Sequence, residues 1–254
     1  EEMLDKFDVN GATKILYSYV WNDFCDWFIE LSKNRMYSDD KEIKAAVLSR
    51  ALNLFEEMLK LVHPFMPYIS EEIWHLLKDR KNGESISVTD FPKFNPDLID
   101  LEAEKEIDFV QNVVTGIRNI RGEMNLAPSK KISVFIKSEP LTENQIKYIS
   151  SLAKVEKLEA NIDIEKPKAS ASSVIKGAEI YVPLEGLIDL DIERERLSKE
   201  IKRLEGMMIG VAKKLENEKF VNNAPADVVA REREKKENWE NSIAKLKSIL
   251  SDLN

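Results

Sequence analysis

The chain has 254 residues, of which 43% are hydrophobic and 33% are charged, and it carries a formal net charge of −8. Its length and apolar fraction indicate a globular protein of one large or two modest domains, while the high charge and only 8 glycines are typical of exposed helices. Because Cys25 is the single cysteine, the composition excludes a disulfide framework, and we expect a reducing, cytoplasmic setting.

The sequence also argues against a membrane partner and against a uniformly basic surface. No apolar run approaches the roughly 20 residues that a membrane span needs, and the N-terminus lacks a basic-then-apolar signal pattern. Residues 187–254 hold 14 basic and 14 acidic side chains, whereas residues 1–186 hold 24 basic against 32 acidic. Since Lys and Arg supply most of the non-specific affinity for phosphates, any contact with nucleic acid must use local basic patches.

Apolar residues at helical spacing dominate the first half of the chain. We expect helices over residues 9–33, 43–63 and 67–77 and from about Leu98 to Gly122. Pro64 ends the second helix by disfavouring helical geometry in the residue before it, and Pro67 is tolerated in the first turn of the third. Residues 86–91 read as a short extended segment. Amphipathic helices with short connections bury their stripes against one another, which predicts a helical bundle over residues 1–128.

The pattern changes to strand-like alternation over residues 129–186. Ile132, Val134 and Ile136 alternate with more polar neighbours, as in a strand with one buried face. Residues 141–153 look helical, and the remaining extended segments are residues 155–162, 174–175 and 179–183. We take residues 166–173 as a flexible connection or a turn between strands. This region therefore predicts a small α/β junction domain made of a sheet with one helix.

A seven-residue period begins at Leu190 and continues through the rest of the chain. The first run of apolar residues with this period is Leu190, Leu197, Ile201, Leu204, Met208, Val211 and Leu215. A second run at spacings of four and three extends from Trp239 to Leu253, after a loop that ends at Pro225. Two such helices joined by a short loop fold back on each other. Residues 187–254 therefore predict an antiparallel two-helix coiled coil about 40 Å long, within a mainly α-helical chain.

Four segments resemble parts of known synthetases. Residues 17–33, YSYVWNDFCDWFIELSK, and residues 61–74, LVHPFMPYISEEIW, resemble the anticodon-binding bundle of the valyl-, isoleucyl- and leucyl-tRNA synthetases. Residues 117–124, IRNIRGEM, look like the later bundle helix of the valyl branch. Residues 220–229, FVNNAPADVV, are similar to the C-terminal arm of bacterial valyl-tRNA synthetases. The resemblance covers nearly all of the chain, and residues 1–7 look like the end of a bundle helix whose start has been removed.

The resemblance implies that the chain recognises valine tRNA within an ATP-dependent ligase that joins valine to that tRNA. The sequence contains neither the His-x-Gly-His signature of class I synthetase active sites nor a Lys-Met-Ser-Lys-Ser-like loop. No Ser–His–Asp set, metal cluster or phosphate loop can be assembled, and His63 and His75 are expected to be structural. We therefore expect an inactive monomer without a cofactor, whose parent polypeptide carries the catalytic domain that binds ATP and Mg²⁺ and a separate proofreading domain.

Polar residues at helix ends are better candidates for RNA contact than the aromatic residues on apolar stripes, because a cation can meet phosphate and an exposed ring can stack on an unpaired base. In the loop expected after the first long helix the candidates are Lys33, Asn34, Arg35 and Tyr37. Simple solvation is the alternative for each of them. A second set is Arg118, Arg121, Asn125, Lys130 and Lys131. Arg118 and Arg121 share a helix face, which is either a phosphate-facing rim or an intramolecular ion-pair site against the acidic bundle.

Basic residues also follow the first heptad helix. The candidates there are Lys199, Lys202, Arg203, Lys213 and Lys214. They interleave with glutamates, as on an ordinary solvated coiled-coil flank. The resemblance implies that the hairpin reaches the outer corner of the L-shaped tRNA, where basic side chains would grip the backbone without reading sequence.

Two other functions fit parts of the pattern. The first is a coiled-coil interaction or dimerisation module, in which residues 190–215 pair with a partner protein or a second copy. The reversing loop over residues 217–225 favours self-folding instead. The second is the equivalent part of an isoleucyl- or leucyl-tRNA synthetase, against which the C-terminal arm argues.

Overall fold

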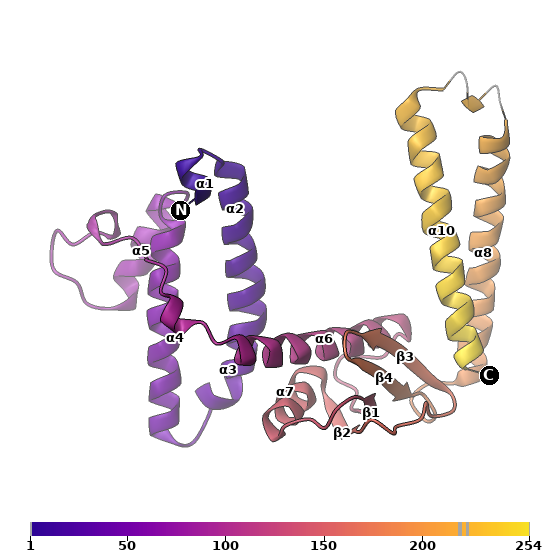
Figure 1. The fold of residues 1–254 in the computed structure, drawn as a ribbon, viewed down its shortest axis with the longest axis horizontal. Helices are drawn as coiled ribbons and strands as arrows, with labels where there is room; N and C mark the ends of the chain where they lie inside the picture. The colour runs from indigo at the N-terminus through magenta and orange to yellow at the C-terminus, as the bar shows by residue number, and fades with distance from the viewer. Residues whose placement is uncertain (1, 218–219, 222–223, 254) are drawn as a thin grey trace. The chain divides into compact units, whose positions relative to one another are not determined.

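The computed structural model describes residues 2–217, 220–221 and 224–253 (Figure 1). The chain forms two compact units, Glu1–Asp100 and Leu101–Asn254. It is mostly helical, and the prediction of a mainly α-helical chain with a small α/β part is confirmed. Across the described ranges, we find no helix with both the length and the apolar character that a membrane crossing requires.

The first unit is helical wherever its described residues form regular structure. Its elements are α1 (Glu2–Asp5), α2 (Val9–Ser18), the π-helix η1 (Tyr19–Phe28), α3 (Ile29–Met36), α4 (Lys41–Val62), α5 (Pro67–Leu77) and the 3-10 helices η2 (Ile86–Val88) and η3 (Pro96–Leu98). Helix α4 packs against both α3 and α5. The predicted second and third helices are confirmed, and Pro67 lies in the first turn of α5 as expected.

The segments α2, η1 and α3 follow one another without a break and make one helix from Val9 to Met36. The Asp8 side chain begins this helix by accepting a hydrogen bond from the Gly11 N–H at 2.8 Å. The prediction that the helix ends at Lys33 is wrong, because the Tyr37 N–H still donates to the Lys33 carbonyl at 3.0 Å. Polar residues in a last turn that faces solvent do not by themselves end a helix.

The expectation of an extended segment over residues 86–91 is also wrong. The Glu71 carboxylate accepts the Ile86 N–H at 3.2 Å, and the Ser85 hydroxyl accepts the Ser87 N–H at 3.2 Å. Because these N–H groups bond to side chains and not to a neighbouring strand, the backbone coils into η2. The core cluster around the buried Ile86 also contains Phe55, Leu59, Ile73, Trp74 and Leu77.

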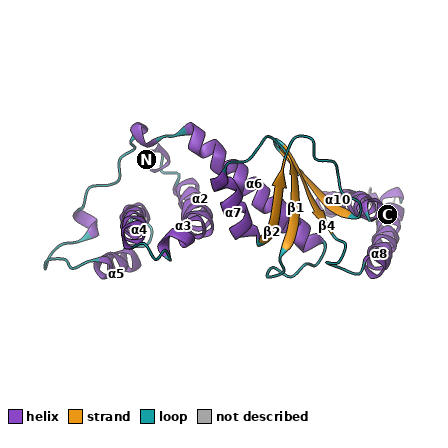
Figure 2. Cartoon of the chain, turned by 90° about the horizontal axis from the view of Figure 1, so that it is seen from below, coloured by secondary structure: helices purple, strands orange, loops and turns teal. Residues whose placement is uncertain are grey.

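Among the described residues of the second unit, four strands form one sheet in the order β2-β1-β4-β3 (Figure 2). The elements before the C-terminal helices are α6 (Leu101–Glu123), β1 (Ile132–Lys137), α7 (Glu143–Ala153), β2 (Val155–Ala160), β3 (Ser170–Ile175) and β4 (Ala178–Pro183). Strands β1 and β2 are parallel and are connected by α7, whereas the other two pairings are antiparallel. The expected connection over residues 166–173 is wrong for its last four residues, because Ser170 already pairs with Pro183 in the sheet.

Helix α6 packs against β3, β4 and α7. Its apolar stripe, which includes Val110, Val114 and Ile117, is fully buried against these elements. The structure therefore places α6 in the second unit, although the sequence pattern assigned it to the helical bundle over residues 1–128. The physical reason is that an apolar stripe specifies burial but not the partner that provides it.

Two long helices, α8 (Leu190–Glu216) and α10 (Ala226–Asp252), pack against each other and complete the second unit (Figure 1). Their shared core cluster contains Ile201, Leu204, Met208, Trp239, Ile243, Leu246 and Leu250. Pro225 lies at the N-cap position, directly before the first residue of α10, so the helix begins where the sequence predicts. The expected reversing loop includes residues 218, 219, 222 and 223, which lie outside the described residues. We call α8 and α10 the hairpin.

Candidate nucleic-acid interface

The first candidate set lies at the C-terminal end of α3. Lys33, Asn34 and Arg35 occupy its last turn rather than a loop, and Tyr37 follows with 80% of its surface exposed. Lys33 is paired with Glu30 at 2.5 Å, so part of its charge is already balanced. Cations at this end of a helix interact favourably with the helix dipole. The arrangement brings a basic turn and one exposed aromatic ring together at one helix end.

Arg121 is not available for RNA contact, which corrects its prediction as a binding residue. The residue is only 6% exposed, and its guanidinium donates hydrogen bonds to the carbonyls of Ala127, Lys130, Ala153 and Lys154 at 2.7 to 3.2 Å. Burial lowers the pKa of this guanidinium from its usual value. Arg121 is neither part of a phosphate-facing rim nor of an ion pair. It connects the C-terminal end of α6 to the end of α7 and to the loop between α6 and β1.

The other residues of this second set stay at the surface. Arg118 is exposed and donates to the Leu152 carbonyl at 3.5 Å. Lys130 donates to the Leu187 carbonyl at 2.5 Å, just before α8 begins. Asn125 has a positive φ of 49° and is exposed, as is Lys131. All four of these residues are exposed, and Arg118 and Lys130 each also donate to a carbonyl within the unit.

Ion pairs divide the five hairpin candidates into two groups. Three have acidic partners: Lys199 with Glu195 at 2.6 Å, Arg203 with Glu200 at 2.6 Å and Lys214 with Glu232 at 3.6 Å. Neither Lys202 nor Lys213 has an ion-pair partner among the residues that the structure describes. These two lysines are eleven residues apart, which places them about 20° from each other around the helix. They therefore form one basic stripe on α8, and we call it the Lys202–Lys213 stripe.

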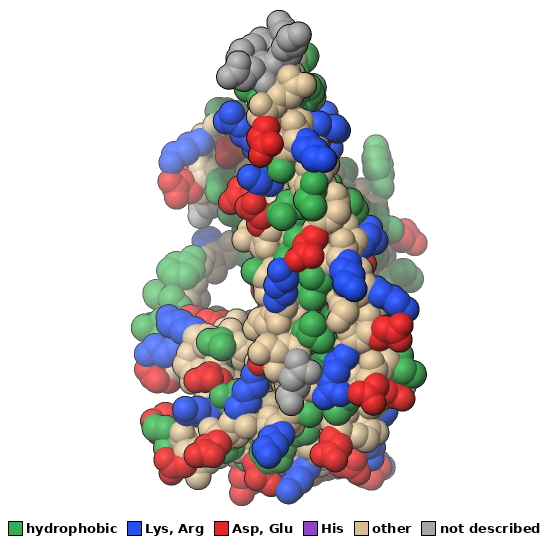
Figure 3. Space-filling view, turned by 90° about the vertical axis from the view of Figure 1, so that its right-hand side faces the viewer, with side chains coloured by type: hydrophobic (Ala, Val, Ile, Leu, Met, Phe, Trp, Pro, Cys, Tyr) green, Lys and Arg blue, Asp and Glu red, His purple; other side chains and the backbone are tan. Residues whose placement is uncertain are grey.

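The paired residues contribute little net charge to this surface. A hydrogen bond from Lys199 holds the pKa of Glu195 below its usual value, and a hydrogen bond from Arg203 does the same for Glu200. Both members of each pair are therefore charged at neutral pH. Figure 3 shows Lys and Arg side chains interleaved with Asp and Glu along the hairpin. The Lys202–Lys213 stripe is the better candidate for phosphate contact, because its charges are not offset by an ion pair among the described residues.

Sequence reasoning missed a buried carboxylate inside the hairpin. Glu232 is 8% exposed and pairs with Lys235 at 2.7 Å and with Lys214 of the other helix at 3.6 Å. The hydrogen bond from Lys235 holds the pKa of Glu232 below its usual value, against the effect of burial. The sequence does contain a signal for this burial. Glu232 lies seven residues before Trp239, at a position where the heptad pattern predicts an apolar residue.

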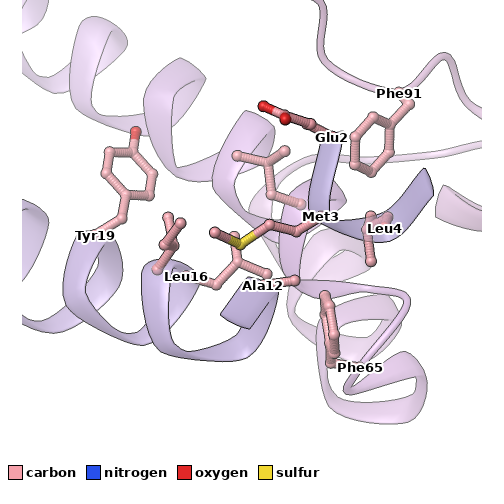
Figure 4. A pocket seen from close by; sticks show the side chains of 10 residues that line it. Glu2, Met3, Leu4, Ala12, Leu16, Tyr19, Phe65 and Phe91 are labelled. Carbon is pink, nitrogen blue, oxygen red and sulfur yellow. The ribbon is translucent and has the colours of Figure 1, made fainter. Parts of the chain in front are cut away.

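The first unit contains an apolar pocket of about 440 Å³ (Figure 4). Its lining residues are Glu2, Met3, Leu4, Ala12, Ile15, Leu16, Tyr19, Leu61, Phe65 and Phe91. Burial, with a smaller effect from Asp23, raises the pKa of Tyr19. Binding sites for polar ligands need several convergent polar groups, and this lining is mostly carbon. In the parts of the chain that the structure describes, no group of three or more His, Cys, Asp or Glu could hold a metal ion.

Comparison with known proteins identifies two segments of the chain. Residues 1–136 match the family model described as the anticodon-binding domain of tRNA ligase. Residues 189–254 match the family model described as the valyl tRNA synthetase tRNA binding arm. These segments include the α3 end and the hairpin, respectively.

The similar curated proteins are valine–tRNA ligases. The protein from Thermotoga maritima is 38% identical over 250 residues, which is 98% of this chain and 28% of that protein. The protein from Fervidobacterium nodosum is 40% identical over 254 residues, with 99% and 28% covered, and the one from Syntrophotalea carbinolica is 36% identical over 255 residues, with 98% and 28% covered. The chain thus spans 28% of the length of these relatives.

Proposed function

Because this chain belongs to the family of anticodon-binding domains of tRNA ligases, we propose that it recognises valine tRNA as the tRNA-binding part of a valine–tRNA ligase. The observation that carries this proposal is that one chain contains both a match to the anticodon-binding domain and a match to the tRNA-binding arm. The valine–tRNA ligase relatives, at 36% to 40% identity, support valine tRNA over other tRNAs.

Two surfaces contact the tRNA in this proposal. At the α3 end, Arg35 and Lys33 meet phosphates while the exposed ring of Tyr37 stacks on an unpaired anticodon base. On the hairpin, the Lys202–Lys213 stripe grips the backbone at the outer corner of the tRNA without reading its sequence. Arg118 and Lys131 add positive charge to the surface of the second unit, and Asn125 adds an uncharged polar group. Two weak contacts within one chain raise the overall affinity, since the second contact forms at a high effective concentration.

The hairpin serves this role as an antiparallel coiled coil in a monomer. Its seam residues Ile201, Leu204 and Ile243 are buried between α8 and α10 of the same chain. A dimerisation or protein-interaction module would need these side chains for a partner, so the rival function is not favoured. The isoleucyl and leucyl alternatives are not favoured either, because the matched arm is that of the valyl enzyme.

We further propose that this chain does not aminoacylate tRNA by itself. The 28% coverage of the relatives supports the assignment of ATP, Mg²⁺ and valine binding to other parts of a longer cytoplasmic enzyme. In that enzyme the present chain contributes binding energy and orientation, which hold the acceptor end of the tRNA at the reacting centre.

The experiment that tests the proposal is a binding titration with valine tRNA and a non-cognate tRNA across a salt series. A truncated chain that ends at Ile188 and lacks the hairpin is measured in parallel. We expect affinity that falls steeply with salt, decreases on truncation and favours valine tRNA. If neither tRNA binds at low salt and the chain forms a stable dimer that truncation abolishes, the interaction-module function replaces this proposal.

A further inference from the structure

Glu123, the last residue of α6, is contacted by both helices of the hairpin. The Lys245 Nζ atom of α10 lies 2.6 Å from the Glu123 Oε1 atom. The Arg196 Nη2 atom of α8 donates to the Glu123 carbonyl oxygen at 3.2 Å. The Glu123 side chain is 26% exposed and that of Lys245 is 65% exposed, so only the carboxylate of this ion pair is partly buried. Glu123 of α6 therefore makes one contact with each helix of the hairpin.

Arg196 is itself fixed before it reaches Glu123. Its Nε atom donates to Glu193 Oε2 at 2.8 Å and its Nη2 atom to Glu193 Oε1 at 2.5 Å, while the Glu193 side chain is only 10% exposed. This two-pronged contact restricts the orientation of the guanidinium. The last carbonyls of a helix lack partners within the helix, and a cation at that end is favourable. Arg196 thus joins the end of α6 to the start of α8 in a defined geometry.

A second connection lies at the end of α10. The Asp252 Oδ2 atom accepts a hydrogen bond from the Ser172 hydroxyl of β3 at 3.2 Å, and its Oδ1 atom pairs with Lys166. Arg194 of α8 donates to the carbonyl of Leu253, which is fully buried. The base of the hairpin is therefore connected to α6 at Glu123 and to the sheet at Asp252.

We propose that Glu123 and Asp252 form a joint that fixes the direction in which the hairpin leaves the sheet, and that this direction positions the Lys202–Lys213 stripe for tRNA. The second part rests on the proposed function, namely that the hairpin binds tRNA. One connection would leave a hinge, whereas two connections on separate elements define a direction. Neither residue touches RNA, and both are positioning residues.

The length of the hairpin makes its direction important. Each helix has 27 residues, which corresponds to about 40 Å. A swing of about 10° at the base then moves the tip by about 7 Å. The same swing moves Lys213 by about 6 Å and Lys202 by about 3 Å. A displacement of this size is comparable to or larger than the reach of a hydrogen bond or an ion pair. A loosened joint would therefore weaken tRNA binding even if every basic side chain of the hairpin were intact.

The test measures the distance between two spin labels in the full chain. With Cys25→Ser to remove the native thiol, labels are attached at Glu156→Cys on β2 and Glu216→Cys at the end of α8, both exposed positions. We expect a narrow distance distribution in the parent and a broad one in the triple variant Glu123→Ala/Arg196→Gln/Asp252→Ala, which removes the contacts of both side chains and the donor to the Glu123 carbonyl. The same triple variant should bind valine tRNA about five-fold more weakly.

Two further variants separate the joint from general charge effects. Glu205→Gln removes an ion pair with Lys247 of 2.7 Å inside the hairpin and should leave the distribution narrow. The exchange Glu123→Lys/Lys245→Glu should restore much of the narrow distribution that Glu123→Lys alone loses.

The outcomes distinguish this inference from the proposed function. An unchanged distribution in Glu123→Ala/Arg196→Gln/Asp252→Ala overturns the joint. A broad distribution with unchanged tRNA affinity overturns its positioning role. A parent chain that binds no tRNA at low salt overturns the proposed function, and with it the positioning role, while the distance distributions still decide whether the joint exists.

Discussion

The guanidinium carbon of Arg80 lies 3.1 Å from the centroid of the Trp74 ring. Arg80 also donates from Nε to the Trp74 carbonyl at 3.0 Å and from Nη2 to Glu56 Oε1 at 2.8 Å. Glu56 in turn accepts the Trp74 indole N–H at 3.1 Å. The Arg80 side chain is 7% exposed, so the segment after α5 is tied to both α4 and α5 by a nearly buried cation.

We expect Arg80→Lys to destabilise the first unit by about 1–3 kcal/mol. A lysine keeps the charge but loses the flat surface that stacks on Trp74 and the fork that reaches Glu56. Urea denaturation followed by tryptophan fluorescence measures the effect. Lys78→Ala is the matched control, since Lys78 also pairs with Glu56 but is 56% exposed and should cost less than about 1 kcal/mol. Equal losses in both variants would contradict the role assigned to the stacked geometry.

The stability of the first unit should depend on pH through Glu56. Burial acts to raise the pKa of Glu56, but hydrogen bonds from Lys78 and Arg80 outweigh it and hold the pKa below the usual 4.5. A carboxyl with a lowered folded-state pKa stabilises the fold above its unfolded pKa, and this contribution is lost as pH falls through the folded value. Stability should therefore decrease as the pH falls below about 4.5.

Glu56→Gln isolates this effect. We expect the variant to be less stable than the parent at about pH 7 and the difference to shrink toward about pH 3, as the carboxyl of the parent takes up a proton. Urea midpoints at the two pH values measure it. If the parent and the variant lose stability in parallel on acidification, Glu56 is not the titrating group.

Arg121→Ala should destabilise the second unit by about 3 kcal/mol or more. The change leaves four carbonyl acceptors without their donor and opens a cavity at the ends of α6 and α7. Thermal unfolding measured by circular dichroism reports the loss. Arg118→Ala, three residues earlier on the exposed side, is the control and should change stability by less than about 1 kcal/mol. Similar melting temperatures for Arg121→Ala and the parent would show that the buried guanidinium is dispensable.

Gly116 is required by the close approach of α6 to the sheet. A Cβ atom at Gly116 would lie 2.7 Å from Ile180 Cδ1 and 3.3 Å from Ser173 Oγ. Because Ile180 is fully buried, we expect Gly116→Ala to destabilise the unit by about 1–3 kcal/mol despite its better helix propensity. Gly122 lies later in the same helix with open space around it, and Gly122→Ala should stabilise by up to about 1 kcal/mol. We expect the melting temperature of Gly116→Ala to lie below that of the parent and the melting temperature of Gly122→Ala to lie above it.

The Lys202–Lys213 stripe predicts a specific change in the salt dependence of tRNA binding. If both lysines meet phosphates, Lys202→Gln/Lys213→Gln should make the negative slope of log affinity against log salt shallower by about 1 for each lost contact. The control is Lys199→Gln/Arg203→Gln, which removes two cations that already have acidic partners and should change the slope less. A larger change of slope in the control would show that the phosphates are contacted by Lys199 and Arg203 rather than by the Lys202–Lys213 stripe.

Most helices and strands could be predicted from the sequence, because the residues at which they begin and end are determined by their immediate neighbours in the chain. Pro64 and Pro67 act through the backbone of their immediate neighbours, so the end of α4 and the start of α5 could be predicted closely. The end of α3 could not, because the polar residues before Tyr37 are compatible with both a helix and a loop. The packing partner of α6 could not be predicted either, because the apolar stripe of α6 does not show whether the helix packs against the bundle or against the sheet.

The candidate site was less predictable than the fold. The spacing of Arg118 and Arg121 indicates a shared helix face, but the acceptors that bury Arg121 include carbonyls 32 and 33 residues further along the chain. The two groups of hairpin cations depend on which glutamate each side chain reaches. Such contacts depend on tertiary packing and on the rotamer of each side chain. The spacing of residues along the chain says little about either.

The boundary between Asp100 and Leu101 has a consequence for exchanging modules between related enzymes. The matched anticodon-binding segment runs to residue 136 and therefore ends inside β1. A chimera joined at that point would interrupt a strand and combine α6 of one parent with the Ile180 surface of another. A chimera joined between Asp100 and Leu101 keeps α6 with the sheet against which it is buried. Packing, rather than the extent of sequence similarity, sets the place where such a chain can be recombined.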